Sequence, residues 1–195
     1  MIKTTLTLIL ATLSLIAFSQ KFEGGFFGGF SASQIDGDQN SGYNKLGITA
    51  GAYTTLMINK NFNWKAEIRY IQKGSYIPAT YYKTSLQYAE VPLIIQYYFN
   101  ERLFIEGGIV PEILLATKVE DPSGVNPPST INPFHTFELE GTAGVGYFLT
   151  ENITAGIRLT YSLFPAGGIV PGTTYAFHRG QYNNVLSFSL YYHIH

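Results

Sequence analysis

The chain has 195 residues, a formal net charge of −1 at pH 7 and no cysteine. It therefore lacks the basic surface that nucleic-acid binding requires, as well as any disulfide framework or thiolate metal site. Charged residues make up 13% of the chain, about half the share usual in soluble domains, whereas aromatic residues reach 15% and glycine contributes 20 positions. We expect a surface that suits lipid better than water and no nucleic-acid partner.

The first residues are typical of a secretory signal peptide. An apolar run from Leu6 to Phe18 follows a single lysine, and Ala17-Phe18-Ser19 offers small residues for cleavage before Gln20. A membrane-spanning helix needs roughly 20 apolar residues, and this run is shorter, which argues against a retained anchor. We therefore predict a cleaved signal peptide over residues 1–19 and a mature domain over residues 20–195.

Eight segments of the mature chain are predicted to form β-strands. In chain order they are Phe22–Ser33, Tyr43–Ile58, Trp64–Tyr70, Leu86–Phe99, Leu103–Ala116, Phe137–Leu149, Ile153–Leu163 and Leu186–Ile194. Apolar and polar residues alternate most clearly in the third strand and in the last three, as in strands whose two faces meet different surroundings. Eight is the smallest strand number of single-chain outer-membrane barrels, whose tilted strands need about 9 to 11 residues to cross the bilayer.

The connections between these strands alternate between short and long. Three are tight polar turns, at Asn59-Lys60-Asn61, Asn100-Glu101 and Thr150-Glu151-Asn152. The predicted long loops are Gln34–Gly42, Gly74–Ser85, Thr117–His135 and Pro165–Gln181. Outer-membrane barrels have short turns on the periplasmic rim and long loops outside. The pattern thus predicts an all-β protein, an eight-stranded antiparallel up-and-down transmembrane β-barrel with both termini in the periplasm.

The cost of burying charge in lipid decides which face of each strand points outward. A basic residue at the membrane midplane of a barrel costs about 2 to 4 kcal/mol, so Lys65, Arg69 and Arg158 should point inward. Eight strands leave an interior just wide enough for side chains, and an unpaired buried ion costs several kcal/mol, so we expect ion pairs there. The predicted interior charge network comprises Lys65, Glu67, Arg69, Glu90, Glu106, Glu138, Glu140 and Arg158.

Two prolines and a set of aromatic residues complete the predicted barrel. Pro92 and Pro111 lie within predicted strands, and because proline cannot donate a ladder hydrogen bond we expect a β-bulge at each. Aromatic residues near strand ends are expected to form girdles at the two membrane interfaces. These residues are Phe62, Trp64, Tyr97, Phe99, Tyr147, Phe148, Tyr161 and Tyr192.

The fourth predicted strand has a recognisable motif. In the run from Gln87 to Phe99, QYAEVPLIIQYYF, an acidic residue, an aliphatic residue, a proline and an apolar stretch lead to an aromatic pair. This run resembles the central strand of PorT-like outer-membrane β-barrel proteins, and Gly47–Tyr53, Gly107-Gly108, Gly141–Tyr147 and Asn184–Leu190 also look like that family. The resemblance covers essentially the whole mature chain and implies a membrane barrel of eight strands. Because the founding member is tied to a protein-secretion system, the resemblance also suggests a link to secretion.

Patterns that would indicate an enzyme or a metal site are weak. His193 and His195 share a strand face, but metal sites usually need three or four protein ligands. Ser187 and Ser189 have no predicted base in reach, and the chain has no Gly-x-Ser-x-Gly motif. We therefore expect no enzymatic activity, no metal site and no cofactor.

These observations favour an integral protein of the cell outer membrane with a structural or interaction role. Its expected partners are outer-membrane lipid and envelope proteins that contact the long loops. One alternative is a narrow channel, which would conduct ions. Another is a soluble periplasmic ligand carrier of the lipocalin type, in which the apolar faces would point inward and Lys65, Arg69 and Arg158 would meet water.

Overall fold

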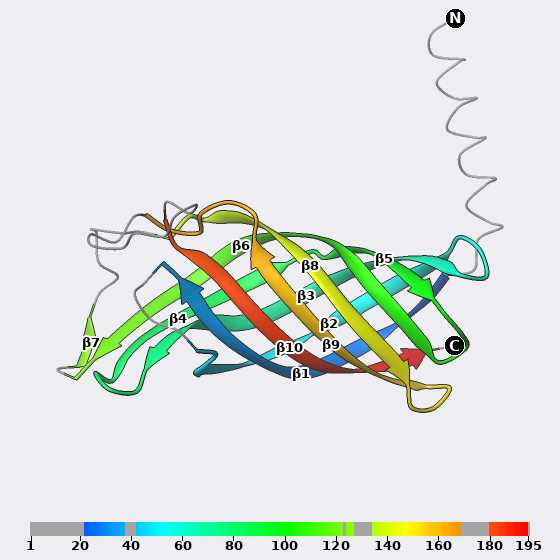
Figure 1. The fold of residues 1–195 in the computed structure, drawn as a ribbon, viewed down its shortest axis with the longest axis horizontal. Helices are drawn as coiled ribbons and strands as arrows, with labels where there is room; N and C mark the ends of the chain where they lie inside the picture. Colours follow the sequence, from blue (N-terminus) through cyan, green and yellow to red (C-terminus); the bar gives the residue numbers. More distant parts are fainter. Residues whose placement is uncertain (1–21, 38–41, 123, 127–133, 169–179, 195) are drawn as a thin grey trace, which may run out of the picture.

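A computed structural model describes residues 22–37, 42–122, 124–126, 134–168 and 180–194, which form one antiparallel sheet curled into a barrel (Figure 1). Its strands are β1 (Phe22–Asp36), β2 (Lys45–Met57), β3 (Phe62–Ile77), β4 (Tyr82–Glu90), β5 (Leu93–Tyr98), β6 (Leu103–Asp121), β7 (Gly124–Asn126), β8 (Phe137–Phe148), β9 (Ile153–Ser162) and β10 (Tyr182–Ile194). The predicted signal peptide at 1–19 lies outside the described residues. Within the described part of the chain, no helix has the length and apolar character to span a membrane.

These ten segments make eight barrel strands. β4 and β5 are two halves of one strand, interrupted at Val91-Pro92, and both halves pair with β3 and with β6. β7 pairs only with the end of β6. Every barrel strand is bonded to the strands that precede and follow it along the chain, and β1 pairs with β10 to close the ring. The predicted up-and-down barrel of eight antiparallel strands is confirmed.

The two faces of each strand meet different surroundings. On the outside, Phe30, Ile68 and Phe137 are 68%, 73% and 63% exposed, whereas Lys65 and Arg158 on the inside are 4% and 3% exposed. We call the outward surface the apolar band; it includes Phe26, Phe30, Ile48, Ile68, Ile95, Ile109, Val145, Ile157, Leu159, Phe188 and Leu190. This orientation contradicts the lipocalin alternative, because a soluble carrier would place the apolar residues inside and the cations outside.

The β-bulges predicted at Pro92 and Pro111 are wrong. The register of β3 with β4 and β5 is unbroken across Pro92, and that of β6 with β8 is unbroken across Pro111. The backbone carbonyl of each proline still accepts a hydrogen bond from the neighbouring strand. Pro92 O accepts from Glu67 N at 3.0 Å, and Pro111 O accepts from Val91 N at 2.9 Å. The register shift lies instead between β4 and β6, where Leu115 is the extra residue.

The short turns lie together at one end of the barrel. The turns at 59–61, 100–101 and 150–152 connect strands at the end where β1 begins and β10 finishes (Figure 1). Side chains shape two of them: Asn59 Oδ1 accepts hydrogen bonds from two backbone N–H groups, and Asn100 Oδ1 does the same. Asparagine favours turns because its side chain can replace a backbone acceptor in this way.

At the opposite end, three strands continue well past the apolar band. The predicted loop Gly74–Ser85 is wrong, because β3 continues to Ile77 and β4 begins at Tyr82. On β3 the band ends at Tyr70, and the strand beyond it adds roughly 20 Å at about 3.3 Å per residue. We call the outermost part of these strands the projection; it comprises residues 75–84, 118–121 and 124–126 and lies at the far left of Figure 1.

Most of the predicted girdle residues lie on the outside. Phe62, Trp64, Phe99, Tyr147 and Tyr192 are all exposed there. Phe148 was predicted among them, but its ring stacks on the inward His193 with centroids 5.2 Å apart and also contacts Phe104. Residues next to each other in a strand point to opposite faces, so Tyr147 and Phe148 could not both be outside.

Candidate functional site: the interior charge network

The charged interior is built around one strand. β3 places Lys65, Glu67, Arg69 and Lys73 on its inward face, since residues two apart in a strand point the same way, and all four are buried. Two apolar clusters flank them. Phe27, Tyr53 and Tyr191 pack together nearer the short turns, and Ile35, Ile71, Leu86, Tyr88 and Val185 pack together nearer the long loops.

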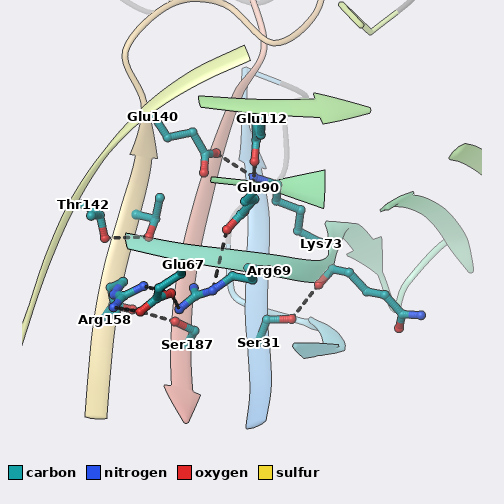
Figure 2. Close-up of polar contacts among 12 residues, drawn as sticks. Ser31, Glu67, Arg69, Lys73, Glu90, Glu112, Glu140, Thr142, Arg158 and Ser187 are labelled. Atoms are coloured by element: carbon teal, nitrogen blue, oxygen red, sulfur yellow. Dashed lines mark hydrogen bonds and ion pairs between the residues drawn. The ribbon is translucent and has the colours of Figure 1, made fainter. Parts of the chain in front are cut away.

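One half of the network, which we call the arginine cluster, consists of Lys65, Glu67, Arg69, Glu106 and Arg158. Glu67 is its centre and contacts three cations. Arg69 Nη2 lies at 2.8 Å and both terminal nitrogens of Arg158 lie at 3.0 Å (Figure 2). Lys65 Nζ lies at 2.9 Å. The two parallel bonds from Arg158 form the bidentate geometry that makes arginine–carboxylate pairs strong. Each carboxylate oxygen of Glu67 thus has a charged donor.

Arg158 connects the remaining members of the arginine cluster. Its Nε and Nη2 donate to Glu106 Oε1 at 2.9 and 2.6 Å, so that one guanidinium from β9 links strands β3 and β6 across the lumen. Tyr191 OH lies within 3.4 Å of Arg69, Arg158 and Glu67. Lys65 Nζ sits 3.7 Å from the centroid of the Tyr191 ring, a cation–π contact. Aromatic and charged groups together fill this part of the lumen.

The other half, which we call the glutamate cluster, consists of Lys73, Glu90, Glu112, Glu138 and Glu140. Lys73 Nζ lies 2.7 Å from Glu112, 2.9 Å from Glu140 and 3.4 Å from Glu90. One ammonium group therefore serves three carboxylates from three strands. A longer contact of 3.8 Å between Arg69 Nε and Glu90 joins the two clusters.

Glu138 is held differently from the other carboxylates. Neutral donors surround it: Tyr88 OH at 3.0 Å, Asn183 Nδ2 at 3.0 and 3.2 Å, and Ser162 Oγ. Among the described residues no cation is within ion-pair distance of it. Glu140 also differs, since its Oε2 is buried without a hydrogen-bond partner in the described part of the chain. The glutamate cluster is thus less completely neutralised than the arginine cluster.

All eight sequence-predicted network residues are buried inside the barrel. Seven of them make ion pairs, and Glu138 makes hydrogen bonds only. Sequence reasoning missed Lys73 and Glu112. The alternation could have identified both. Lys73 is an even number of residues from the inward Lys65, and Glu112 is an even number from the inward Glu106, so each points to the same face as that residue. We ended the third predicted strand at Tyr70, so Lys73 fell outside it.

The network does not present an open catalytic or metal-binding position. Carboxylate oxygens of Glu90, Glu112 and Glu140 lie within 4.8 Å of one another, and oxygen ligands of this kind suit hard cations. However, Lys73 Nζ contacts all three and already supplies a positive charge among them. The arrangement neutralises charge and cross-links strands, and its charged members are buried.

A small cavity lies at the short-turn end of the interior. It measures about 20 Å³, room for a water molecule, and its lining includes Tyr53, Thr154 and His193. Tyr53 OH lies 2.6 Å from His193 Nδ1, and Thr154 Oγ1 lies 2.7 Å from His193 Nε2. Both ring nitrogens of this histidine thus contact hydroxyl groups. His195, its partner in the weak metal-site pattern, lies outside the described residues.

The chain matches the family described as "Outer membrane protein beta-barrel domain" over residues 18–166. It belongs to this family. This outer-membrane barrel also resembles Ail, the attachment invasion locus protein of Yersinia pestis, with a TM-score of 0.54 and 12% identity over 89% of this chain and 99% of Ail.

Two further solved structures match this chain. Ail in complex with the heparin analogue sucrose octasulfate matches with a TM-score of 0.54 and 13% identity over 89% of this chain and 99% of Ail. Neisserial surface protein A matches with a TM-score of 0.46 and 13% identity over 88% of this chain and 95% of that protein. A comparison with curated proteins gave no match. The likeness to Ail at this identity establishes the fold, and the family match places this barrel in the outer membrane.

Proposed function

We propose that this outer-membrane barrel is a non-conducting, non-enzymatic interaction protein that presents a binding surface outside the cell. The observation that carries the proposal is the filled lumen. Arg158, which is 3% exposed, reaches from β9 to carboxylates on β3 and β6, and Lys73, fully buried, binds carboxylates from three other strands. A channel would need a continuous polar path, and these cross-links occupy it.

The projection is the surface that we propose to bind a partner. Its β3–β4 hairpin ends in an uncharged tip, on which Tyr81 and Tyr82 are 69% and 41% exposed. Tyr81 has φ of 54°, a left-handed conformation that costs a non-glycine residue about 1–3 kcal/mol and is common at ligand-binding positions. Exposed tyrosines provide large contact area at low entropic cost, because the side chain has only two χ angles.

The extracellular side is favoured over the periplasmic side because it offers more surface. The periplasmic turns are two or three residues long, whereas strands β3, β4 and β6 extend far beyond the apolar band. Contact with a periplasmic secretion component, which the PorT-like resemblance suggests, is the second candidate. We also propose that the segment 1–19 directs export and is removed, so that residues 20–195 form the mature barrel.

The charge on the projection informs the chemistry of the partner. Lys83 and Lys118 both bind Glu120, at 3.3 and 2.6 Å, so a carboxylate of the chain itself already meets the two cations. Ail was crystallised with a sulfated sugar, and for this barrel such a polyanion would have to displace Glu120. A partner that contacts the tyrosines, rather than a polyanion, is therefore our first expectation.

Two measurements test this function. Protein reconstituted in planar bilayers should show no unitary conductance steps, and regular steps would contradict the filled lumen. A photo-crosslinking residue at Tyr81, introduced in intact cells, should give a discrete adduct, and the same residue at Glu151 in a periplasmic turn is the matched control. An adduct at Glu151 with none at Tyr81 would support the periplasmic candidate instead.

A further inference from the structure

The outer wall of the barrel opens locally where β8 and β9 approach the extracellular side. Leu163 N donates to Leu139 O at 2.9 Å, and His135 N donates to Ala166 O at 2.8 Å. These two bonds hold the strands together below and above the opening. Between them lies Pro165, which has no N–H to donate. The ladder is therefore interrupted at this point while the wall stays closed on either side.

The interruption forms a groove of about 400 Å³. Its lining has four apolar residues, Phe137, Leu139, Phe164 and Pro165. The two polar lining residues are His135 and Glu138. Phe137 and Phe164 are each 63% exposed. The carboxylate of Glu138 accepts hydrogen bonds from Tyr88, Ser162 and Asn183. Among the described lining residues, His135 is the exposed polar side chain.

The groove is continuous with the surface that meets the membrane. Outward residues of β8 and β9, such as Val145, Ile157 and Leu159, belong to the apolar band, and Phe137 lies on the same outward face of β8 as Val145. One end of the groove therefore opens toward the hydrocarbon region. The other end, at His135, is close to where the strands leave the membrane and lipid headgroups begin.

We propose that this groove binds one acyl chain of an outer-leaflet lipid, whose phosphate accepts a hydrogen bond from His135. Lipid is the occupant because the groove extends the apolar band, the face that meets lipid. When an acyl chain fills the groove, the apolar surfaces of both are removed from water. An imidazole can donate an N–H to phosphate in its neutral or its charged form. The proposal does not depend on the function assigned to the projection.

The test counts lipids that stay with the purified barrel. The protein is reconstituted with dimyristoylphosphatidylglycerol, released from detergent and weighed by native mass spectrometry. Wild type should retain one lipid. Leu139→Trp, which fills the groove, should lower the lipid-bound fraction at least tenfold, whereas Val145→Trp, on the same face of the same strand but outside the groove, should leave it unchanged.

A second variant tests the headgroup contact without disturbing the fold. His135 is exposed, so His135→Ala should leave the barrel intact, reduce retention of phosphatidylglycerol several-fold and leave retention of dimyristoylglycerol, which has no phosphate, unchanged. Equal retention by wild type and Leu139→Trp, or no retained lipid on wild type, would overturn the site. Equal loss of both lipids in His135→Ala would overturn the phosphate contact.

Discussion

The two halves of the interior charge network are built on the same strand and differ in charge balance. In the arginine cluster, Glu67 contacts three cations and Glu106 contacts two. In the glutamate cluster, Lys73 contacts three carboxylates, and Glu138 is held by neutral donors. The difference teaches that buried charges in a filled barrel can be neutralised by several overlapping ion pairs in one region and by a single cation in another.

The largest effect is expected at Lys73. Lys73→Met removes the ammonium group that three buried carboxylates share, and breaking a buried ion pair from one side costs about 3–5 kcal/mol. We expect loss of at least this much unfolding free energy, measured by urea titration in lipid vesicles, and loss of the heat-dependent shift in electrophoretic mobility. Lys118→Met on the projection, an exposed ion-pair partner, is the control. A change below about 1 kcal/mol, the range of surface ion pairs, would show that the cluster does not need its cation.

A smaller loss is expected at the centre of the arginine cluster. Glu67→Gln removes a charge that three cations share, but Arg158 and Lys65 retain Glu106. We expect destabilisation by about 2–3 kcal/mol, the range for hydrogen bonds to charged groups. In a double-mutant cycle, Arg158→Met should cost less when Glu67→Gln is already present than it does in wild type. Strict additivity of the two losses would contradict the proposed coupling.

Glu138 sharpens the comparison because no ion pair is lost there. Tyr88 and Ser162 donate to different oxygens of Glu138. Glu138→Gln keeps one of these acceptors, places an amide N–H that can donate to the other hydroxyl, and lowers the negative charge of the glutamate cluster. We expect a change of less than about 1 kcal/mol in unfolding free energy, in the stabilising direction. Destabilisation comparable with that of Lys73→Met would show that the carboxylate charge itself is required.

The smallest effect is expected outside the membrane, at Glu120. Hydrogen bonds from Lys118 and then Lys83 hold the pKa of this partly exposed carboxyl below its ordinary value. A depressed carboxyl pKa means that the contact is present at neutral pH and is lost as the pH falls through the lowered pKa. Carboxyl ¹³C NMR should show titration at a lower pH in wild type than in Lys83→Ala/Lys118→Ala. Identical midpoints would rule out the two lysines as the cause.

Much of the fold could be predicted from residue alternation, and the errors have physical reasons. Pro92 and Pro111 do not shift the register. The carbonyl of each proline still accepts a hydrogen bond from the neighbouring strand, and only the bond that its N–H would have donated is lost. The predicted loop after Gly74 is largely strand, because polar residues on both faces obscure alternation once a hairpin leaves the membrane. Phe148 was predicted to lie outside because it is aromatic. Its position next to the outward Tyr147 in the strand instead indicates an inward side chain.

By itself, the sequence determined the strand number, the inward parity of the charges and the outward apolar surface, since period-two alternation and the cost of charge in lipid allow few other arrangements. Only the tertiary structure decided which ions pair. Lys73 meets Glu112 and Glu140 because the stagger of tilted strands brings distant residues to the same depth in the barrel. The groove at Pro165 likewise depends on two hydrogen bonds between strands, a feature that local sequence does not encode.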